Sequence, residues 1–91
     1  MRKVVYRRPE AMTDRPTHYC PGCGHGLVQK LIAEVVDELG IRERTIGIAP
    51  VGCSILAYFY MNFDMIEAAH GRTPAVATGV ARAREDAILI S

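Results

Sequence analysis

The chemistry that this sequence can support is concentrated in nine residues, His-Tyr-Cys-Pro-Gly-Cys-Gly-His-Gly, at positions 18–26. Two of the three cysteines and two of the three histidines lie in this stretch. The Cys20-x-x-Cys23 spacing can place two thiolates at one metal centre. The neighbouring glycines allow the backbone to turn tightly around sulfur, because they tolerate positive φ angles. The stretch therefore predicts a metal site.

A third thiol is available at Cys53, about thirty positions downstream in a second glycine-containing turn. A [4Fe–4S] cluster uses four thiolates, so its last ligand would have to lie beyond Ser91. Zinc is the alternative, because three cysteines and either His18 or His25 would complete a tetrahedral site. A redox-active C-x-x-C with a buried, free Cys53 is the third interpretation. Spacing alone leaves zinc and an iron–sulfur cluster equally open.

The positions of the three histidines indicate roles around the cysteines and a possible cofactor loop. His18 and His25 flank the two cysteines, where hydrogen bonding is a more common role than metal ligation. His70 precedes Gly71 in a loop of small residues. It could cap the backbone there, or it could bind an anionic cofactor together with Arg72, and both interpretations stay open.

The elements that must position these residues follow from hydrophobic periodicity. Apolar residues recur every four positions, as in the apolar stripe of an amphipathic helix, at Leu27, Leu31, Val35 and Leu39, with Val28, Ile32 and Val36 alongside. Gln29 falls off this stripe, and Gly40 ends the helix. The helix begins directly after the glycine-rich stretch. Its free N–H groups and the positive end of its dipole therefore face whatever that stretch binds.

The remaining pattern predicts an α/β fold with a parallel sheet. Predicted after the first helix are a buried strand at 45–49, a short helix at 55–60, an ambiguous segment at 62–69, a helix at 75–84 and a strand at 87–91. Cys53 lies just past the first strand, at the edge where such sheets collect ligands. Two or three strands bury little apolar area, so we expect the front part of a longer protein.

Size and composition limit the function further. The chain has 91 residues, a length that allows one small domain. Its formal net charge is +1, and it has three cysteines. Near-neutral charge argues against nucleic acid, and no apolar run reaches the ~20 residues that span a bilayer. The odd number of cysteines and the metal-type spacing of two of them argue against a disulfide scaffold. We therefore expect the protein in a reducing cytoplasm. Residues 1–17 predict an extended N-terminal arm before a domain at 18–91.

Three ordered motifs together resemble one family. They are His-Tyr-Cys-Pro-Gly-Cys-Gly-His-Gly at 18–26, Ala-Pro-Val-Gly-Cys-Ser at 49–54 and Ala-His-Gly-Arg-Thr-Pro-Ala-Val-Ala-Thr-Gly at 69–79. The resemblance is to the beta subunit of 2-oxoacid:ferredoxin oxidoreductases. It implies the N-terminal part of a thiamine-diphosphate-binding α/β domain. The implied reaction is oxidative decarboxylation of a 2-oxoacid to an acyl-CoA, with coenzyme A as co-substrate and electrons passed to ferredoxin.

The resemblance also implies roles for individual residues. Cys20, Cys23 and Cys53 match three ligands of a [4Fe–4S] cluster. The loop that contacts the thiamine ring system matches Val51, Gly52, Cys53 and Ser54, and a second loop of that pocket matches His70 and Gly71. The implied partners are the alpha subunit, possible gamma and delta subunits, and ferredoxin. The motif at 49–54 favours a 2-oxoisovalerate or 2-oxoglutarate enzyme.

Two parts of the family pattern are not present in these 91 residues. The Gly-Asp-Gly segment and downstream asparagine that hold Mg²⁺ and the diphosphate would begin where this sequence ends. The fourth cluster cysteine would also lie further on. The glutamate that activates the cofactor comes from the partner subunit in this family, so Glu67 is not its counterpart. We expect the 91-residue chain to be inactive alone.

Overall fold

The structure, a computed structural model, describes residues 3–91 of the chain. Met1 and Arg2 lie outside the described residues, and so does that part of the predicted arm at 1–17. The elements follow one another as α1 (Gly24–Leu39), η1 (Arg42–Arg44, a 3-10 helix), β1 (Thr45–Ala49), η2 (Cys53–Leu56, also 3-10), α2 (Ala57–Tyr60), β2 (Asp64–Glu67), α3 (Thr73–Ala83) and β3 (Ile88–Ile90).

The three strands form one parallel sheet in the order β2-β1-β3. The central position of β1 explains its sequence, because all of Thr-Ile-Gly-Ile-Ala is buried. In the register, Ile46 lies opposite Asp64 on one side and Leu89 on the other. Met65 lies over Gly47, where a Cβ atom would collide with its sulfur. The predicted α/β fold with a parallel sheet is confirmed.

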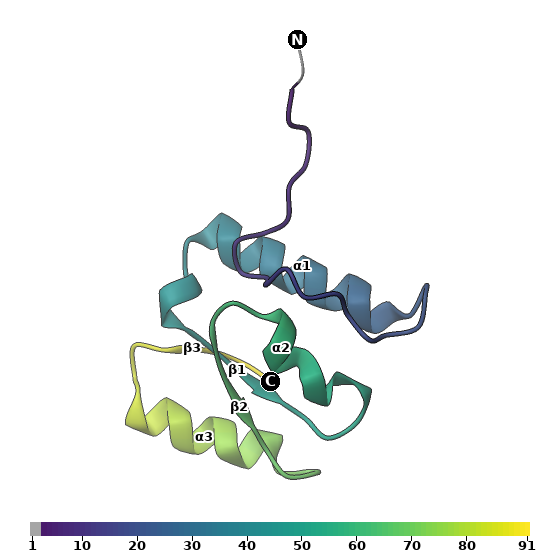
Figure 1. The fold of residues 1–91 in the computed structure, drawn as a ribbon. Helices are drawn as coiled ribbons and strands as arrows, with labels where there is room; N and C mark the ends of the chain where they lie inside the picture. Colours follow the sequence, from purple (N-terminus) through teal and green to yellow (C-terminus); the bar gives the residue numbers. More distant parts are fainter. Residues whose placement is uncertain (1–2) are drawn as a thin grey trace.

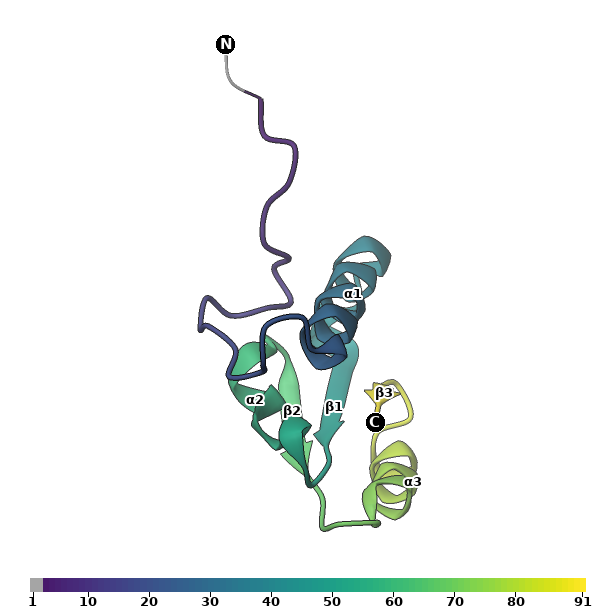
Figure 2. The ribbon, with the colours of Figure 1, turned by 90° about the vertical axis from the view of Figure 1, so that its right-hand side faces the viewer.

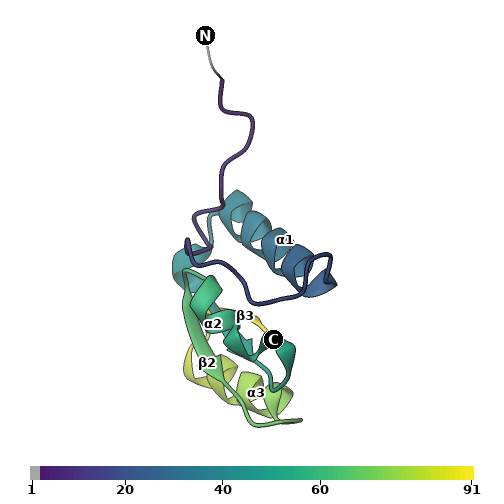
Figure 3. The ribbon, with the colours of Figure 1, turned by 45° about the vertical axis from the view of Figure 1, so that its right-hand side comes forward.

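The helices are distributed over both sides of this sheet. Helix α1 lies on one side and α3 on the other, as Figures 1 and 2 show from two directions. Helix α2 leads from the end of β1 back to β2 and packs on both strands, and Figure 3 shows it between β2 and the start of α1. Among residues 3–91, no helix combines the length and the apolar character needed to cross a membrane.

Helix α1 differs from the prediction in its start and in its buried face. It starts at Gly24, so the end of the glycine-rich stretch forms its first turn. Its buried residues are Gln29, Ala33 and Val36. Within the predicted stripe, Val36 is buried and Ile32 packs against the core, as expected. The four residues at every fourth position are exposed instead, with exposed fractions of 58% at Leu27, 48% at Leu31, 50% at Val35 and 64% at Leu39. The buried face thus covers only one side of the predicted stripe and extends to Gln29 and Ala33.

The buried face of α1 follows from a contact that periodicity does not encode. Ala33 and Ala11 are both fully buried and pack with Val36 and Met61 in one apolar cluster. Two small side chains allow the irregular segment at 9–13 to approach the helix closely. A leucine at position 33 would keep that segment away. Packing with a distant part of the chain thus selected the helix face.

The segment at 9–13 is fixed by hydrogen bonds to two elements. The Asp37 carboxylate at the end of α1 accepts the backbone N–H groups of Glu10 at 2.5 Å and Ala11 at 3.0 Å. On the other side, the Asn62 N–H donates to the Ala11 carbonyl at 2.6 Å, and the Thr13 N–H donates to the Tyr60 carbonyl at 2.7 Å. The segment therefore connects α1 to the end of α2.

Replacing Asp37 by alanine tests this connection. The change leaves two backbone N–H groups without their charged acceptor, and each such hydrogen bond contributes about 1.5–3 kcal/mol. We expect a loss of at least about 2 kcal/mol in the free energy of unfolding and faster hydrogen exchange at residues 10 and 11. Urea unfolding and hydrogen-exchange mass spectrometry of the purified protein measure both. Glu38→Ala, at an exposed neighbour on α1, is the control, and equal effects of the two variants would contradict the prediction.

Candidate functional site

The two cysteines of the C-x-x-C motif are joined by a tight turn. Pro21 and Gly22 occupy its central positions, and the Cys23 N–H donates to the Cys20 carbonyl at 2.9 Å. Gly22 has a φ angle of +79°, as the third position of a type II turn requires. Proline sets the second position and glycine the third, so the sequence itself specifies this turn. Both thiols are thereby carried on one rigid loop.

Cys23 is also the residue immediately before α1. Its backbone is extended, with φ −68° and ψ 135°, and no side chain within the described residues caps the helix. The first N–H groups of α1 therefore remain available, and the positive end of the helix dipole faces the turn. The predicted orientation of the helix end toward the loop is confirmed, although the helix begins earlier than expected.

Aromatic side chains hold this loop against the rest of the fold. The Tyr60 hydroxyl, on a residue only 2% exposed, accepts the His18 backbone N–H at 2.9 Å and lies 2.6 Å from His18 Nδ1. The Tyr19 ring stacks on His25, with centroids 5.3 Å apart and an interplanar angle of 19°. The Tyr19 hydroxyl accepts a hydrogen bond from Gln29 Nε2 at 2.7 Å. The loop is thus anchored to both α1 and α2.

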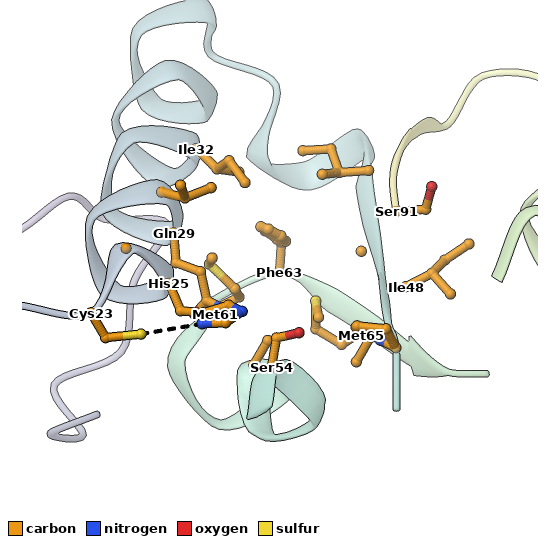
Figure 4. Close-up of a pocket in the computed structure, with 17 residues that line it drawn as sticks. Cys23, His25, Gln29, Ile32, Ile48, Ser54, Met61, Phe63, Met65 and Ser91 are labelled. Atoms are coloured by element: carbon orange, nitrogen blue, oxygen red, sulfur yellow. Dashed lines mark hydrogen bonds between the residues drawn. The ribbon is translucent and has the colours of Figure 1, made fainter. Parts of the chain in front are cut away.

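Both motif histidines make hydrogen bonds, as predicted. His18 pairs with Tyr60 through Nδ1, and His25 Nδ1 lies 3.3 Å from the Cys23 sulfur. Figure 4 shows the contact between His25 and Cys23 at the edge of a cavity. The two imidazoles thus have different partners: His18 contacts the buried Tyr60 hydroxyl, and His25 contacts the Cys23 thiol.

Cys53 lies just beyond the carboxyl end of β1. It follows Gly52, whose φ of 138° and ψ of −159° are essentially restricted to glycine. In the cysteine-bearing loop at 18–26, burial raises the pKa of the Tyr19 phenol, and the hydrogen bond from Gln29 lowers it.

The three thiols are free. Cys20 and Cys53 are exposed, Cys23 is partly exposed, and none of the three forms a disulfide. Within residues 3–91, no three His, Cys, Asp or Glu side chains converge on one point as a single metal ion requires. In an iron–sulfur cluster each thiolate binds a different iron atom, so its cysteines lie further apart than those around one zinc ion.

A cavity of about 550 Å³ lies between α1 and the sheet. Figure 4 shows His25 and Gln29 entering it from α1, with Phe63, Met65 and Ile48 opposite and Ser54 near its mouth. Gln29 is only 7% exposed. Its Oε1 atom finds no hydrogen-bond partner among the described residues. The cavity is thus apolar with one unsatisfied amide oxygen, which calls for a hydrogen-bond donor.

The two predicted cofactor loops emerge at the same edge of the sheet. Val51 to Ser54 follow the end of β1, and His70 with Gly71 follow β2. Because β1 and β2 are parallel, their carboxyl ends coincide, and the Ala68 N–H donates to the Ala49 carbonyl at 3.1 Å just beyond them. Val51, His70 and Gly71 are exposed. This edge is where open α/β sheets bind ligands.

Sequence reasoning missed three residues of this site: Tyr19, Gln29 and Tyr60. Tyr60 belongs to an aromatic run that reads as ordinary packing, and its role depends on a contact across 42 positions. Gln29 was expected on the polar face of α1. A buried glutamine beside a tyrosine is visible only once the helix face is known. Of the three, only Tyr19 could have been suspected from the sequence, because it lies between His18 and Cys20.

Comparison with known proteins identifies related sequences and a related fold. No model of a known protein family matches the sequence. The chain is 48% identical, over 99% of its length, to the ketoisovalerate oxidoreductase subunit VorA of Methanothermobacter thermautotrophicus, of which it covers 21%. Over 81% of its length it is 40% identical to the 2-oxoglutarate oxidoreductase subunit KorB of Mycobacterium tuberculosis, of which it covers 20%. The chain thus spans about a fifth of these relatives.

A solved structure agrees with the sequence relatives. The fold matches a 2-oxoglutarate:ferredoxin oxidoreductase from Magnetococcus marinus with a TM-score of 0.81 at 32% identity. The match covers 96% of this chain and 31% of that one, which was solved with 2-oxoglutarate, coenzyme A and succinyl-CoA bound. Sequence and fold therefore agree. The chain belongs to the 2-oxoacid:ferredoxin oxidoreductase family, as a segment related to the VorA and KorB subunits.

Proposed function

We propose that this chain is part of a subunit of a 2-oxoacid:ferredoxin oxidoreductase, which converts a 2-oxoacid to an acyl-CoA and passes electrons to ferredoxin. The observation that carries the proposal is the 48% identity to a ketoisovalerate oxidoreductase subunit across 99% of the chain. The 2-oxoglutarate relative is 40% identical over a shorter stretch. These figures support a 2-oxoisovalerate or 2-oxoglutarate enzyme, as the motif at 49–54 does.

Cys20, Cys23 and Cys53 are the proposed protein ligands of a [4Fe–4S] cluster in this subunit. The type II turn carries the first two cysteines on one loop directly before α1. Cys53 follows β1 at the carboxyl edge of the sheet. A fourth ligand would come from outside these 91 residues. When bound, the cluster supplies one-electron transfer between substrate oxidation and ferredoxin.

The proposed second cofactor is thiamine diphosphate with Mg²⁺, held in part by Val51, Gly52, Cys53, Ser54, His70 and Gly71. Its chemistry when bound is stabilisation of negative charge at the carbonyl carbon during decarboxylation. The support from this chain is the position of both loops at the carboxyl edge of the sheet. The conformation of Gly52 turns the first loop away from β1, which directs Cys53 and Ser54 to that edge. Residues for Mg²⁺ would come from elsewhere in the protein.

Further subunits of the same enzyme and ferredoxin are the proposed protein partners, because the relatives are named as subunits. We propose residues 1–17 as an arm, whose segment at 9–13 packs against the proposed cofactor domain at 18–91. The cluster and three unpaired thiols suit a reducing cytoplasm. The alternative, a small zinc-binding interaction module, has no support among the relatives or in the described part of the chain.

Replacing Cys53 by alanine tests the cluster and the activity together. We expect the intact enzyme, prepared without air, to lose the iron and sulfide of this cluster and 2-oxoacid-dependent ferredoxin reduction by at least about tenfold, because one of its thiolate ligands is removed. Iron analysis, visible absorption and a reduction assay measure these effects. Tyr58→Phe, a conservative change at a partly exposed side chain, serves as the control. A Cys53→Ala enzyme with full iron content would refute this ligand set.

Replacing Gly22 by alanine tests the turn that carries the first two thiols. A side chain at its φ of +79° costs about 1–2 kcal/mol. We expect lower iron occupancy and faster cluster loss in air, measured by the decay of visible absorption. Gly26→Ala is the matched control: it lies nearby in helical backbone, and a Cβ would meet open space at both positions. Equal decay rates in the two variants would show that the turn conformation is unimportant.

A further inference from the structure

The contact between His25 and Cys23 is built from both sides. His25 Nδ1 lies 3.3 Å from the Cys23 sulfur (Figure 4). On its other side the imidazole stacks on the Tyr19 ring at 5.3 Å. The Tyr19 hydroxyl accepts the 2.7 Å hydrogen bond from Gln29, a buried residue of α1. The position of the imidazole is therefore set by two further side chains.

The direction of this hydrogen bond follows from the chemistry of sulfur. A cysteine sulfur that is ionised or bound to iron carries no hydrogen and can only accept. The contact then requires that His25 Nδ1 carries the proton. The other motif histidine has no such constraint, because the Tyr60 hydroxyl beside His18 Nδ1 can either donate or accept.

We propose that His25 is a positioning residue that donates an N–H···S hydrogen bond to Cys23 and thereby raises the reduction potential of the cluster that Cys23 helps to hold. This inference rests on the proposed function. A donor at a ligating sulfur withdraws electron density and stabilises the reduced cluster, which carries the additional negative charge. Tyr19 supports the same effect indirectly, because its ring keeps the imidazole beside the sulfur.

The test is a redox titration of the complete enzyme, with all subunits, followed by electron paramagnetic resonance. The signal that disappears in Cys53→Ala identifies the cluster. We expect His25→Ala to shift its midpoint to a more negative potential at unchanged iron content. His25→Asn places an amide N–H near the position of Nδ1 and should restore most of the wild-type midpoint. Tyr19→Leu removes the stacking surface and should shift the midpoint in the same direction as His25→Ala, by less.

The outcomes separate this inference from the proposed function. A wild-type enzyme with the cluster and a His25→Ala midpoint equal to wild type would overturn the role of His25 and leave the proposed function intact. A wild-type enzyme without any iron–sulfur cluster would overturn both. If His25→Ala loses its iron, Tyr19→Leu decides: a more negative midpoint supports the inference, and an unchanged midpoint overturns it. Tyr58→Phe, outside the site, controls for general effects of aromatic substitution.

Discussion

The arrangement of the candidate site depends on the link between Tyr60 and His18. The two cysteine-bearing segments are separated by about thirty residues and belong to different elements. The Tyr60 hydroxyl lies at the end of the short helix that follows Cys53, and it binds both the backbone N–H and the ring of His18, two residues before Cys20. Because Tyr60 is buried, this link is shielded from competing water. It joins the N-terminal loop to α2, the helix that follows the second cysteine motif.

Two different structural features position the cysteines. At the first motif, a proline–glycine turn and the start of α1 combine to hold Cys20 and Cys23 next to a positive helix end. At the second, the end of a buried strand and an unusual glycine conformation carry Cys53 to the carboxyl edge of the sheet. The first solution is electrostatic and local, whereas the second follows from sheet topology. Each could form without the other, and their alignment requires tertiary packing.

The sequence predicted those features that local chemistry determines. The strand at 45–49 is a β-branched apolar run closed by proline, and the structure has a strand at those residues. The turn at Cys20 follows from Pro21 and Gly22. The start of α1 was placed too late, because glycines at 24 and 26 read as loop although the helix includes them. The strand β2 was ambiguous because Asp64–Glu67 is half exposed at a sheet edge, where alternation is weak.

The buried face of α1 and the role of Tyr60 could not be predicted for a common reason. Both depend on pairs of residues far apart in sequence: Ala11 with Ala33, and His18 with Tyr60. The apolar stripe of α1 is wide enough to include Val36 as well as the exposed row, so periodicity alone could not determine which part of it would be buried. The packing of small side chains against the segment at 9–13 decided it. The proposed ligand sets, in contrast, came from family resemblance and remain proposals for the whole enzyme.

The exposed line of Leu27, Leu31, Val35 and Leu39 has a practical consequence for handling the protein. A continuous row of large, exposed apolar side chains on one helix face promotes association in water. The 91-residue chain, prepared alone, would self-associate along this face as its concentration rises, and its hydrodynamic size would grow accordingly. Light scattering of such a preparation would then measure self-association through this apolar row and would give no information on the cysteine site. Spectroscopy on aggregated material would misrepresent the thiols, so the complete enzyme is the appropriate sample.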